Sequence, residues 1–308
     1  MKNSIYKKIL LRICTGIGLS TALMLTSNVH AAEKIPVLAS FSILGDLVRV
    51  VGAERVSVTT LVGPNEDAHV FEPRPSDAKT LLQAKLLVTN GLGFEPWMQK
   101  LIKSTGYKGL VVLASAGVKP RTMPKESTQN HVETDPHAWQ NPNNVVLYVR
   151  NIAAGLTKID PVGASTYSAN AEAYVQELLT LDQWAKAQFS AIPSEKRKVI
   201  TSHDAFGYFA AHYQIKFSAA QGMSTDTEPS AKGVAQLIKQ IQREKIKAVF
   251  TENMSSPKLL DQLSKDAGVR LGENLYADAL STAEKSGSTY LLMMRHNTTQ
   301  LALGMRLN

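Results

Sequence analysis

Residues 135–142 read Asp-Pro-His-Ala-Trp-Gln-Asn-Pro and place one imidazole close to two prolines. Each proline fixes its own φ and restricts the residue before it, so the backbone around His137 has little freedom. Such stiffness suits a metal ligand, because a ligand must be held close to its productive position. His137 is therefore the first candidate for metal ligation.

Three further side chains stand in comparable places. His69 and His203 each follow a predicted strand, and Asp278 lies in a loop shortly after another strand. In open α/β sheets, ligands bind beyond the carboxyl ends of the strands, so these side chains are expected to meet His137 in one cleft. Three imidazoles and one carboxylate form a closed four-ligand set that suits Zn²⁺, which prefers tetrahedral nitrogen and oxygen ligands. The sequence thus predicts a zinc site.

The other histidines are predicted to have different roles. His212 and His296 lie inside amphipathic helices, where we expect ordinary structural roles. His131 stands alone in a polar loop and is interpreted as a solvated residue, with transient metal capture as the alternative. Glu252 ends a predicted strand, and either faces the cleft behind a ligand or starts a helix.

Strands and helices alternate in both halves of the chain, which predicts βαβ units and mostly parallel sheets. Strands are expected at 36–39, 55–62, 86–89, 110–113, 197–201, 215–218, 248–251 and 269–271. Helices are expected at 42–51, 76–84, 94–104, 142–159, 206–213, 230–244, 257–267 and 290–304. We expect Ser76 to cap the second of these helices, and Asn141 followed by Pro142 to start the fourth.

The longest predicted helix begins at Asp160-Pro161 and is ended by Pro193. At about 1.5 Å per residue, some thirty residues span roughly 45 Å, enough for a rigid strut between two lobes. A long surface helix of a single domain is the alternative. We predict an N-terminal α/β lobe over 32–160, a linking helix over 161–192 and a C-terminal α/β lobe over 193–308, with the metal site in the cleft.

The first 31 residues have the pattern of a secretory signal peptide. A basic start with four Lys or Arg residues precedes an apolar run over 13–26 and a Val-His-Ala ending. We expect cleavage after Ala31, no transmembrane span and an exported mature chain of 277 residues, which is 308 less 31. The only cysteine, Cys14, lies inside the signal, which argues against a lipid on a processed N-terminal cysteine and excludes a disulfide. We therefore expect a soluble, unlipidated protein of the periplasm.

The net charge of +8 falls to +4 in the mature chain, because the signal carries four of the 34 basic groups and none of the 26 acidic ones. No dense block of Lys and Arg with interleaved aromatic residues occurs. Nucleic acid is therefore not an expected partner.

Six segments carry a resemblance to a known family, at 68–73, 135–139, 202–208, 228–230, 250–252 and 275–280. Through them the chain resembles the periplasmic receptors of zinc and manganese ABC transporters, whose two lobes are joined by one long helix. The resemblance covers nearly the whole mature chain and implies that His69, His137, His203 and Asp278 are the metal ligands. It also implies a membrane permease and its cytoplasmic ATPase as partners, with a periplasmic metallochaperone as a further candidate. We expect a monomer that catalyses nothing.

The choice of metal depends on two features. Family members that resemble manganese receptors usually carry Glu at the position of His203, and a hard carboxylate suits Mn²⁺ better than imidazole does. Many zinc receptors carry a long loop rich in His and Asp before the second histidine, whereas this chain has only His131 in a short loop. We expect Zn²⁺ as the cargo, with a manganese or iron receptor of the same family as the alternative.

Two rival functions come from other classes. An exported zinc hydrolase needs an open metal position for water and a general base, for which Glu252 or Glu72 could serve. The chain has no His-Glu-x-x-His helix, which counts against this function. A receptor for a siderophore complex or a vitamin needs a broad apolar lining, and few aromatic residues are expected around the site. The predicted function is therefore high-affinity capture of Zn²⁺ in the periplasm and its delivery to an ABC permease.

Overall fold

A computed structural model describes residues 33–124, 132–225, 230–255 and 258–308. The predicted signal peptide over 1–31 and its cleavage site lie outside the described residues, and so does His131. The resembling segment at 228–230 is described only at Ser230.

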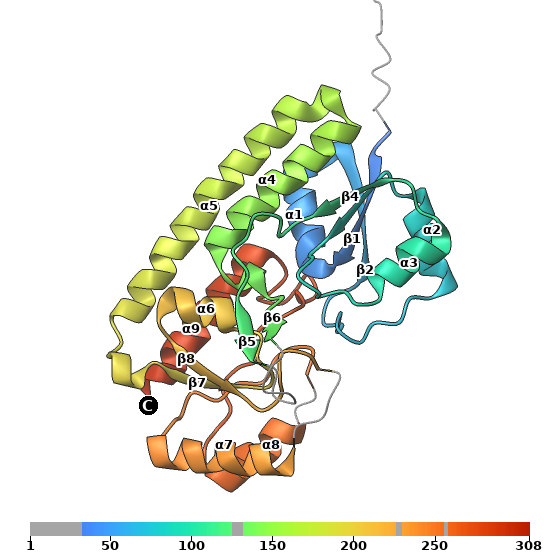
Figure 1. Cartoon of the computed structure of the whole chain (residues 1–308). Coiled ribbons are helices and arrows are strands. Elements are labelled where there is room, and N and C mark those ends of the chain that lie inside the picture. Colours follow the sequence, from blue (N-terminus) through green and yellow to red (C-terminus); the bar gives the residue numbers. More distant parts are fainter. Residues whose placement is uncertain (1–32, 125–131, 226–229, 256–257) are drawn as a thin grey trace, which may run out of the picture. The chain divides into compact units, whose positions relative to one another are not determined.

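A parallel four-stranded sheet forms the centre of the N-terminal half (Figure 1). Its strands are β1 (Ile35–Phe41), β2 (Val56–Val62), β3 (Leu86–Thr89) and β4 (Leu110–Leu113), in the order β2-β1-β3-β4. In β1 every residue after the second is buried. A parallel strand in the middle of a sheet is covered on both faces, which explains its nearly continuous apolar sequence.

Helices cover both faces of this sheet (Figure 1). On one face lie α1 (Ser42–Gly52) and α4 (Pro142–Ile159), which contact each other and the strands. On the other face lie α2 (Pro75–Gln83) and α3 (Met98–Thr105). Loops follow the carboxyl ends of β2, β3 and β4, and loops at this edge of a parallel sheet can carry a site.

The predicted start of α4 is confirmed. The side chain of Asn141 accepts a hydrogen bond from the N–H of Asn143 at 3.0 Å, and Pro142 is the first helical residue. The long helix that follows, α5 (Ala164–Ser190), has 27 residues, which corresponds to about 40 Å. It begins three residues later than predicted, because Pro161–Gly163 forms a 3₁₀ turn. The helix packs along α4 and also contacts α1 and α9 (Figure 1).

The C-terminal half is also built on parallel pairing. Strands β7 (Lys198–Thr201) and β8 (Lys216–Ala219) pair in parallel, and single parallel bridges join Val249 to Ile200 and to Leu271. Its helices are α6 (Gly207–Tyr213), α7 (Ala231–Glu244), α8 (Lys258–Ala267) and α9 (Tyr290–Arg306). The strands predicted at 248–251 and 269–271 are therefore reduced to bridges.

The shortening at residue 248 has a physical reason. The backbone N–H groups of Lys247 and Ala248 both donate to the side-chain oxygen of Asn308, at 2.6 and 3.1 Å. These donors are consequently not available to extend a ladder with β7.

Three local predictions are wrong. Ser76 does not cap α2, because the helix begins one residue earlier, at Pro75. The carboxylate of Asp77 accepts a hydrogen bond from the backbone N–H of Arg74 at 2.7 Å. The helix predicted at 94–104 starts only at Met98, since residues 94–97 are in turns. The polar segment before His137 is not wholly irregular, because β5 (Thr122–Pro124) and β6 (Val132–Thr134) pair antiparallel in it.

Residues Lys34–Asn308 form one compact unit. A large apolar cluster runs through both halves, and a smaller one around Ile200, Leu237 and Leu260 lies beside α7 and α8. The division into two lobes with a linking helix at the stated boundaries stays a prediction. Among the described residues, no helix combines the length and the apolar character that a membrane crossing requires.

Candidate metal centre

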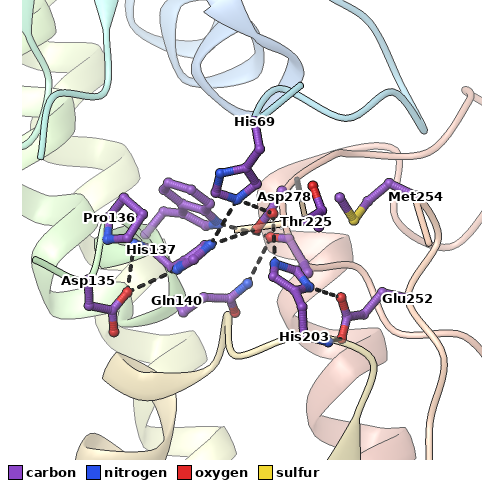
Figure 2. Close-up of polar contacts among 12 residues, drawn as sticks. His69, Asp135, Pro136, His137, Gln140, His203, Thr225, Glu252, Met254 and Asp278 are labelled. Carbon is purple, nitrogen blue, oxygen red and sulfur yellow. Dashed lines mark hydrogen bonds and ion pairs between the residues drawn. The ribbon is translucent and has the colours of Figure 1, made fainter. Parts of the chain in front are cut away.

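The four side chains predicted to bind metal meet at one place (Figure 2). One ligand atom of each lies within 4.8 Å of those of the other three. Nε2 of His69 lies 3.2 Å from Oδ2 of Asp278, and Nε2 of His203 lies 3.0 Å from the same oxygen. Nε2 of His137 lies 3.3 Å from Nε2 of His69. The sequence-predicted set is thus one spatial cluster, contributed by segments more than 200 residues apart in the chain.

His69 is held by the loop that follows β2. Its backbone N–H donates to the carboxylate of Asp67 at 2.9 Å, and the indole N–H of Trp97 donates to the carbonyl of Ala68 at 2.8 Å. The ring of Phe94 stands edge-on to the imidazole, with centroids 4.8 Å apart. Among the described residues, no carboxylate contacts Nδ1 of His69.

His137 is oriented by the carboxylate two residues before it. Oδ1 of Asp135 accepts from the N–H of His137 at 3.0 Å and lies 2.9 Å from Nδ1 of its ring. A carboxylate only accepts, so Nδ1 carries a proton and Nε2 is the ring nitrogen that faces the cluster. The side-chain amide of Asn90 also donates to the carbonyl of Pro136 at 2.9 Å, and this bond holds the loop that carries His137.

His203 follows β7 and is oriented by Glu252. Oε1 of Glu252 accepts from the N–H groups of Ser202 and His203 at 2.9 and 3.2 Å, and Oε2 contacts Nδ1 of the ring. Glu252 itself is fixed by a parallel bridge to Leu275. Of the two roles left open for Glu252 by the sequence, the structure shows the one behind His203, and the role of His203 as a ligand stays a prediction.

Asp278 is carried by a loop that the segment around His137 holds in place. The side chains of Trp139 and Gln140 both donate to the carbonyl of Ala277, at 2.9 and 2.8 Å. Asp278 is fully buried, and its Oδ1 has no hydrogen-bond partner among the described residues. A buried carboxylate oxygen without a donor calls for a cation, because such an atom is costly to leave unsatisfied.

The charges of the cluster shift the pKa values of its members. Burial by itself lowers the pKa of His137, but the carboxylates of Asp278 and Asp135 raise it to about 9. Burial opposes a charge on His203 as well, yet Glu252 and Asp278 raise its pKa well above the usual value. Burial raises the pKa of Asp278, and the two imidazoles outweigh it and hold the pKa well below the usual range. Without a metal ion, protons on the imidazoles therefore balance the carboxylates.

The donor set fits a small divalent ion. Ligand atoms about 2.0–2.2 Å from a common zinc ion can be at most about 4.4 Å apart. The separations of 3.0 and 3.2 Å from Asp278 to His203 and His69 fall inside that limit, and the bound of 4.8 Å for the whole cluster lies close to it. Since the protein supplies three nitrogens and one oxygen, a tetrahedral ion would have no position left for a catalytic water.

The histidines predicted to be structural lie elsewhere. Nε2 of His212 lies 2.6 Å from Asp182 on α5, and His296 contacts Ser286 and the carbonyl of Asn274. Glu72, one of the two bases imagined for a hydrolase, is exposed.

Sequence reasoning missed the role of Asp135. A carboxylate two residues before a histidine was visible in the motif, and this spacing allows one carboxylate to reach both the backbone N–H and the ring of His137.

Comparison with known proteins gives a consistent picture. The family described as "Zinc-uptake complex component A periplasmic" (ZnuA) matches residues 37–304. The chain is 32% identical over 280 residues to the manganese-binding lipoprotein MntA of Halalkalibacterium halodurans, covering 91% of each. It is 30% identical over 287 residues to the iron-binding protein YfeA of Yersinia pestis, covering 93% of this chain and 91% of that protein. The fold is similar to that of the periplasmic zinc binding protein TroA from Treponema pallidum, with a TM-score of 0.83, 28% identity, and 88% and 99% of the two chains covered.

Proposed function

This chain belongs to the ZnuA family of periplasmic zinc-uptake components, and we propose that it captures Zn²⁺ with high affinity and delivers it to an ABC permease. The observation that supports this most is the burial of His69, His137, His203 and Asp278 side by side, with one oxygen of Asp278 that has no hydrogen-bond partner among the described residues. We propose these four residues as the metal ligands.

The family consists of substrate-binding components of metal transporters, and its curated relatives are named as binding lipoproteins. The protein is therefore a metal-binding receptor and not an enzyme, which excludes the zinc hydrolase. A receptor of this class works with a membrane permease and a cytoplasmic ATPase.

Zinc is the cargo that the donor set favours. Three of the four donors are imidazole nitrogens, and two of those rings are held with Nε2 turned to the cluster by Asp135 and Glu252. For sites of nitrogen and oxygen donors, Zn²⁺ binds more tightly than Fe²⁺ or Mn²⁺. A single carboxylate, Asp278, is a poor match for a site selected for Mn²⁺.

Manganese or iron is the second candidate. It is favoured by the relatives, because MntA is named for manganese and YfeA for iron. Availability of the metal in the periplasm also decides which ion is carried.

Elemental analysis of the protein purified from the periplasm without added metal tests the proposal. We expect about one zinc per chain, and its loss in a variant in which His137 and Asp278 are both replaced by Ala. A wild-type protein that carries no transition metal and takes up none on titration would contradict the receptor function itself.

Three further properties stay predictions. We propose that the protein is a monomer, which light scattering tests, and that it accepts zinc from a periplasmic metallochaperone, which zinc transfer between the purified proteins tests. Because several curated relatives are named as lipoproteins, the predicted lack of a lipid is tested by the mass of the exported protein.

A further inference from the structure

A pocket of about 500 Å³ opens beside the metal cluster. Its walls come from four separate parts of the chain and include His69, Leu92, Glu133, Thr134, Met223 and Ser224. His69 is the only one of the four proposed ligands on its wall. The pocket therefore leads to the cluster from the His69 side.

The exposure of the four side chains agrees with this direction. The side chain of His69 is 5% exposed, whereas those of His137, His203 and Asp278 are 0% exposed. His69 is also the one histidine of the cluster whose Nδ1 has no carboxylate behind it among the described residues. Among the four side chains, the one that borders the pocket is thus the most exposed, and within the described part of the chain it lacks the carboxylate that orients His137 and His203.

The pocket has the size and chemistry to receive a hydrated divalent cation. Six waters occupy roughly 180 Å³ at about 30 Å³ each, well below the volume of the pocket. The carboxyl group of Glu133 and the hydroxyl groups of Thr134 and Ser224 are oxygen groups of the kind that replace water around a cation, and Met223 adds a soft thioether.

One hydrogen bond joins two of the segments that border the pocket. Asp67 uses one carboxylate oxygen for the N–H of His69, at 2.9 Å, and accepts from the hydroxyl of Thr225 with the other, at 2.6 Å. Thr225 directly follows Met223 and Ser224 on the pocket wall (Figure 2 shows Thr225). This contact therefore ties the His69 loop to the loop opposite it, across 158 residues of sequence.

A second tie of the His69 loop is independent of Thr225. The N–H of Asn65 donates to the carbonyl of Leu280 at 2.9 Å, and Asn253 donates to the side chain of Asn65 at 2.8 Å. Loss of the Thr225 hydroxyl would therefore loosen the pocket while leaving the loop attached.

We propose that this pocket is the exchange route of the metal site, through which a hydrated divalent cation passes His69, and that the Asp67–Thr225 hydrogen bond sets the rate of exchange. The inference rests on the proposed receptor function. The hydrogen bond joins two loops that border the pocket, so breaking it eases opening of the pocket for entry and for release alike.

The first arm of the test obstructs the route. Thr134→Trp places a large side chain at an exposed position on the pocket wall. Stopped-flow mixing with Zn²⁺ gives the association rate constant, and an excess of a chromophoric chelator gives the dissociation rate constant. We expect both to fall by about tenfold while Kd is unchanged, because an obstacle on the proposed route slows entry and release equally.

The matched control is Thr157→Trp, which makes the same substitution in a separate surface pocket bordered by Arg150 and Glu172. It should leave both rate constants at the wild-type values. Equal rates for Thr134→Trp and wild type, or a change in Kd with one rate alone, would overturn the route.

The second arm of the test removes the hydrogen bond between Thr225 and Asp67. Thr225→Val removes the hydroxyl but keeps the shape, and should raise both rate constants by a factor between about 2 and about 10, as one hydrogen bond would. Thr225→Ser keeps the hydroxyl and should exchange zinc like wild type. Unchanged rates in Thr225→Val would overturn the role of the hydrogen bond.

The two failures are distinguishable. If the wild-type protein binds no zinc, the receptor function fails and no rate can be compared. If the wild type binds zinc while the Thr134 and Thr225 variants exchange it at the wild-type rates, the receptor function stands and the exchange route is wrong.

Discussion

The carboxylate of Glu252 fixes both the orientation of the His203 ring and the location of a proton on its Nδ1. Oε1 accepts from the backbone N–H of His203 and Oε2 contacts its Nδ1, so the ring cannot rotate without losing a partner. Asp135 orients His137 similarly, because its Oδ1 accepts from the backbone N–H of His137 and also contacts Nδ1 of the ring. Two of the three imidazoles are therefore oriented with Nε2 facing the cluster.

Replacing Glu252 by Gln should weaken zinc binding by about 10–100-fold, the usual effect of losing such a partner. The amide of Gln can donate to Nδ1 of His203, which then favours the tautomer with Nε2 protonated and unable to ligate. Chelator competition measures the affinity. Glu172→Gln, at an exposed ion pair with Arg150, is the control and should bind as wild type does. Wild-type affinity in Glu252→Gln would contradict the positioning role.

The ligand set itself is tested by five variants. His203→Ala leaves a gap that water can fill, so a weaker three-ligand site should survive. Asp278→Ala removes the only carboxylate of the set, and Asp278→Asn keeps its size but not its charge. His212→Ala and His296→Ala should keep wild-type zinc affinity, because both side chains have partners far from the cluster.

Melting temperature provides a second readout for these variants. Zinc at 1,000 times its Kd stabilises a protein by about 4 kcal/mol, and this gain should shrink in the His203 and Asp278 variants. Loss of zinc binding in the His212 or His296 variant, with normal binding in His203→Ala, would show that the cluster is not the site.

Zinc binding should release protons even at pH 7.5. Because Asp278 and Asp135 raise the pKa of His137 to about 9, this ring is protonated in the empty protein and must lose its proton to ligate. Affinity should therefore fall steadily as the pH drops from about 9, and not only below the ordinary histidine value of about 6.5. Calorimetry in buffers of different ionisation enthalpy counts the protons. No release at pH 7.5 would contradict the protonated empty state.

Away from the site, Asp182 should stabilise the fold in a pH-dependent way. Burial would raise its pKa, but hydrogen bonds from His212, Lys186 and Tyr213 lower it to about 2. A lowered carboxyl pKa gives stability that is present above about pH 4 and is lost as the pH falls towards 2.

The variant Asp182→Asn should therefore reduce the free energy of unfolding by about 1–2 kcal/mol at pH 6, with a smaller difference at pH 3. Urea unfolding of the zinc-free proteins measures both. Glu172→Asn, at an exposed ion pair on the same helix, is the control and should change little. A difference that grows as the pH falls would contradict the assignment.

The site was easier to predict from the sequence than some of the elements around it. Each proposed ligand follows a strand or stands beside a proline, so residue type and position together pointed to the cluster of His69, His137, His203 and Asp278. The strand at 248–251 was not predictable in its true form, because the N–H of its first residue, Ala248, donates to Asn308, 60 residues away. The tie from Asp67 to Thr225 likewise depends on a tertiary contact that leaves no local pattern.

Competitive titration of the metal-free mature protein with Zn²⁺ and Mn²⁺ tests the central claim most directly. Each ion is titrated in the presence of a chelator of known affinity at pH 7.5, and the metal content of the protein is confirmed by elemental analysis. With three imidazoles in the site, Zn²⁺ should bind more tightly than Mn²⁺ by orders of magnitude. Equal or tighter binding of Mn²⁺ would contradict the assignment of zinc as the cargo.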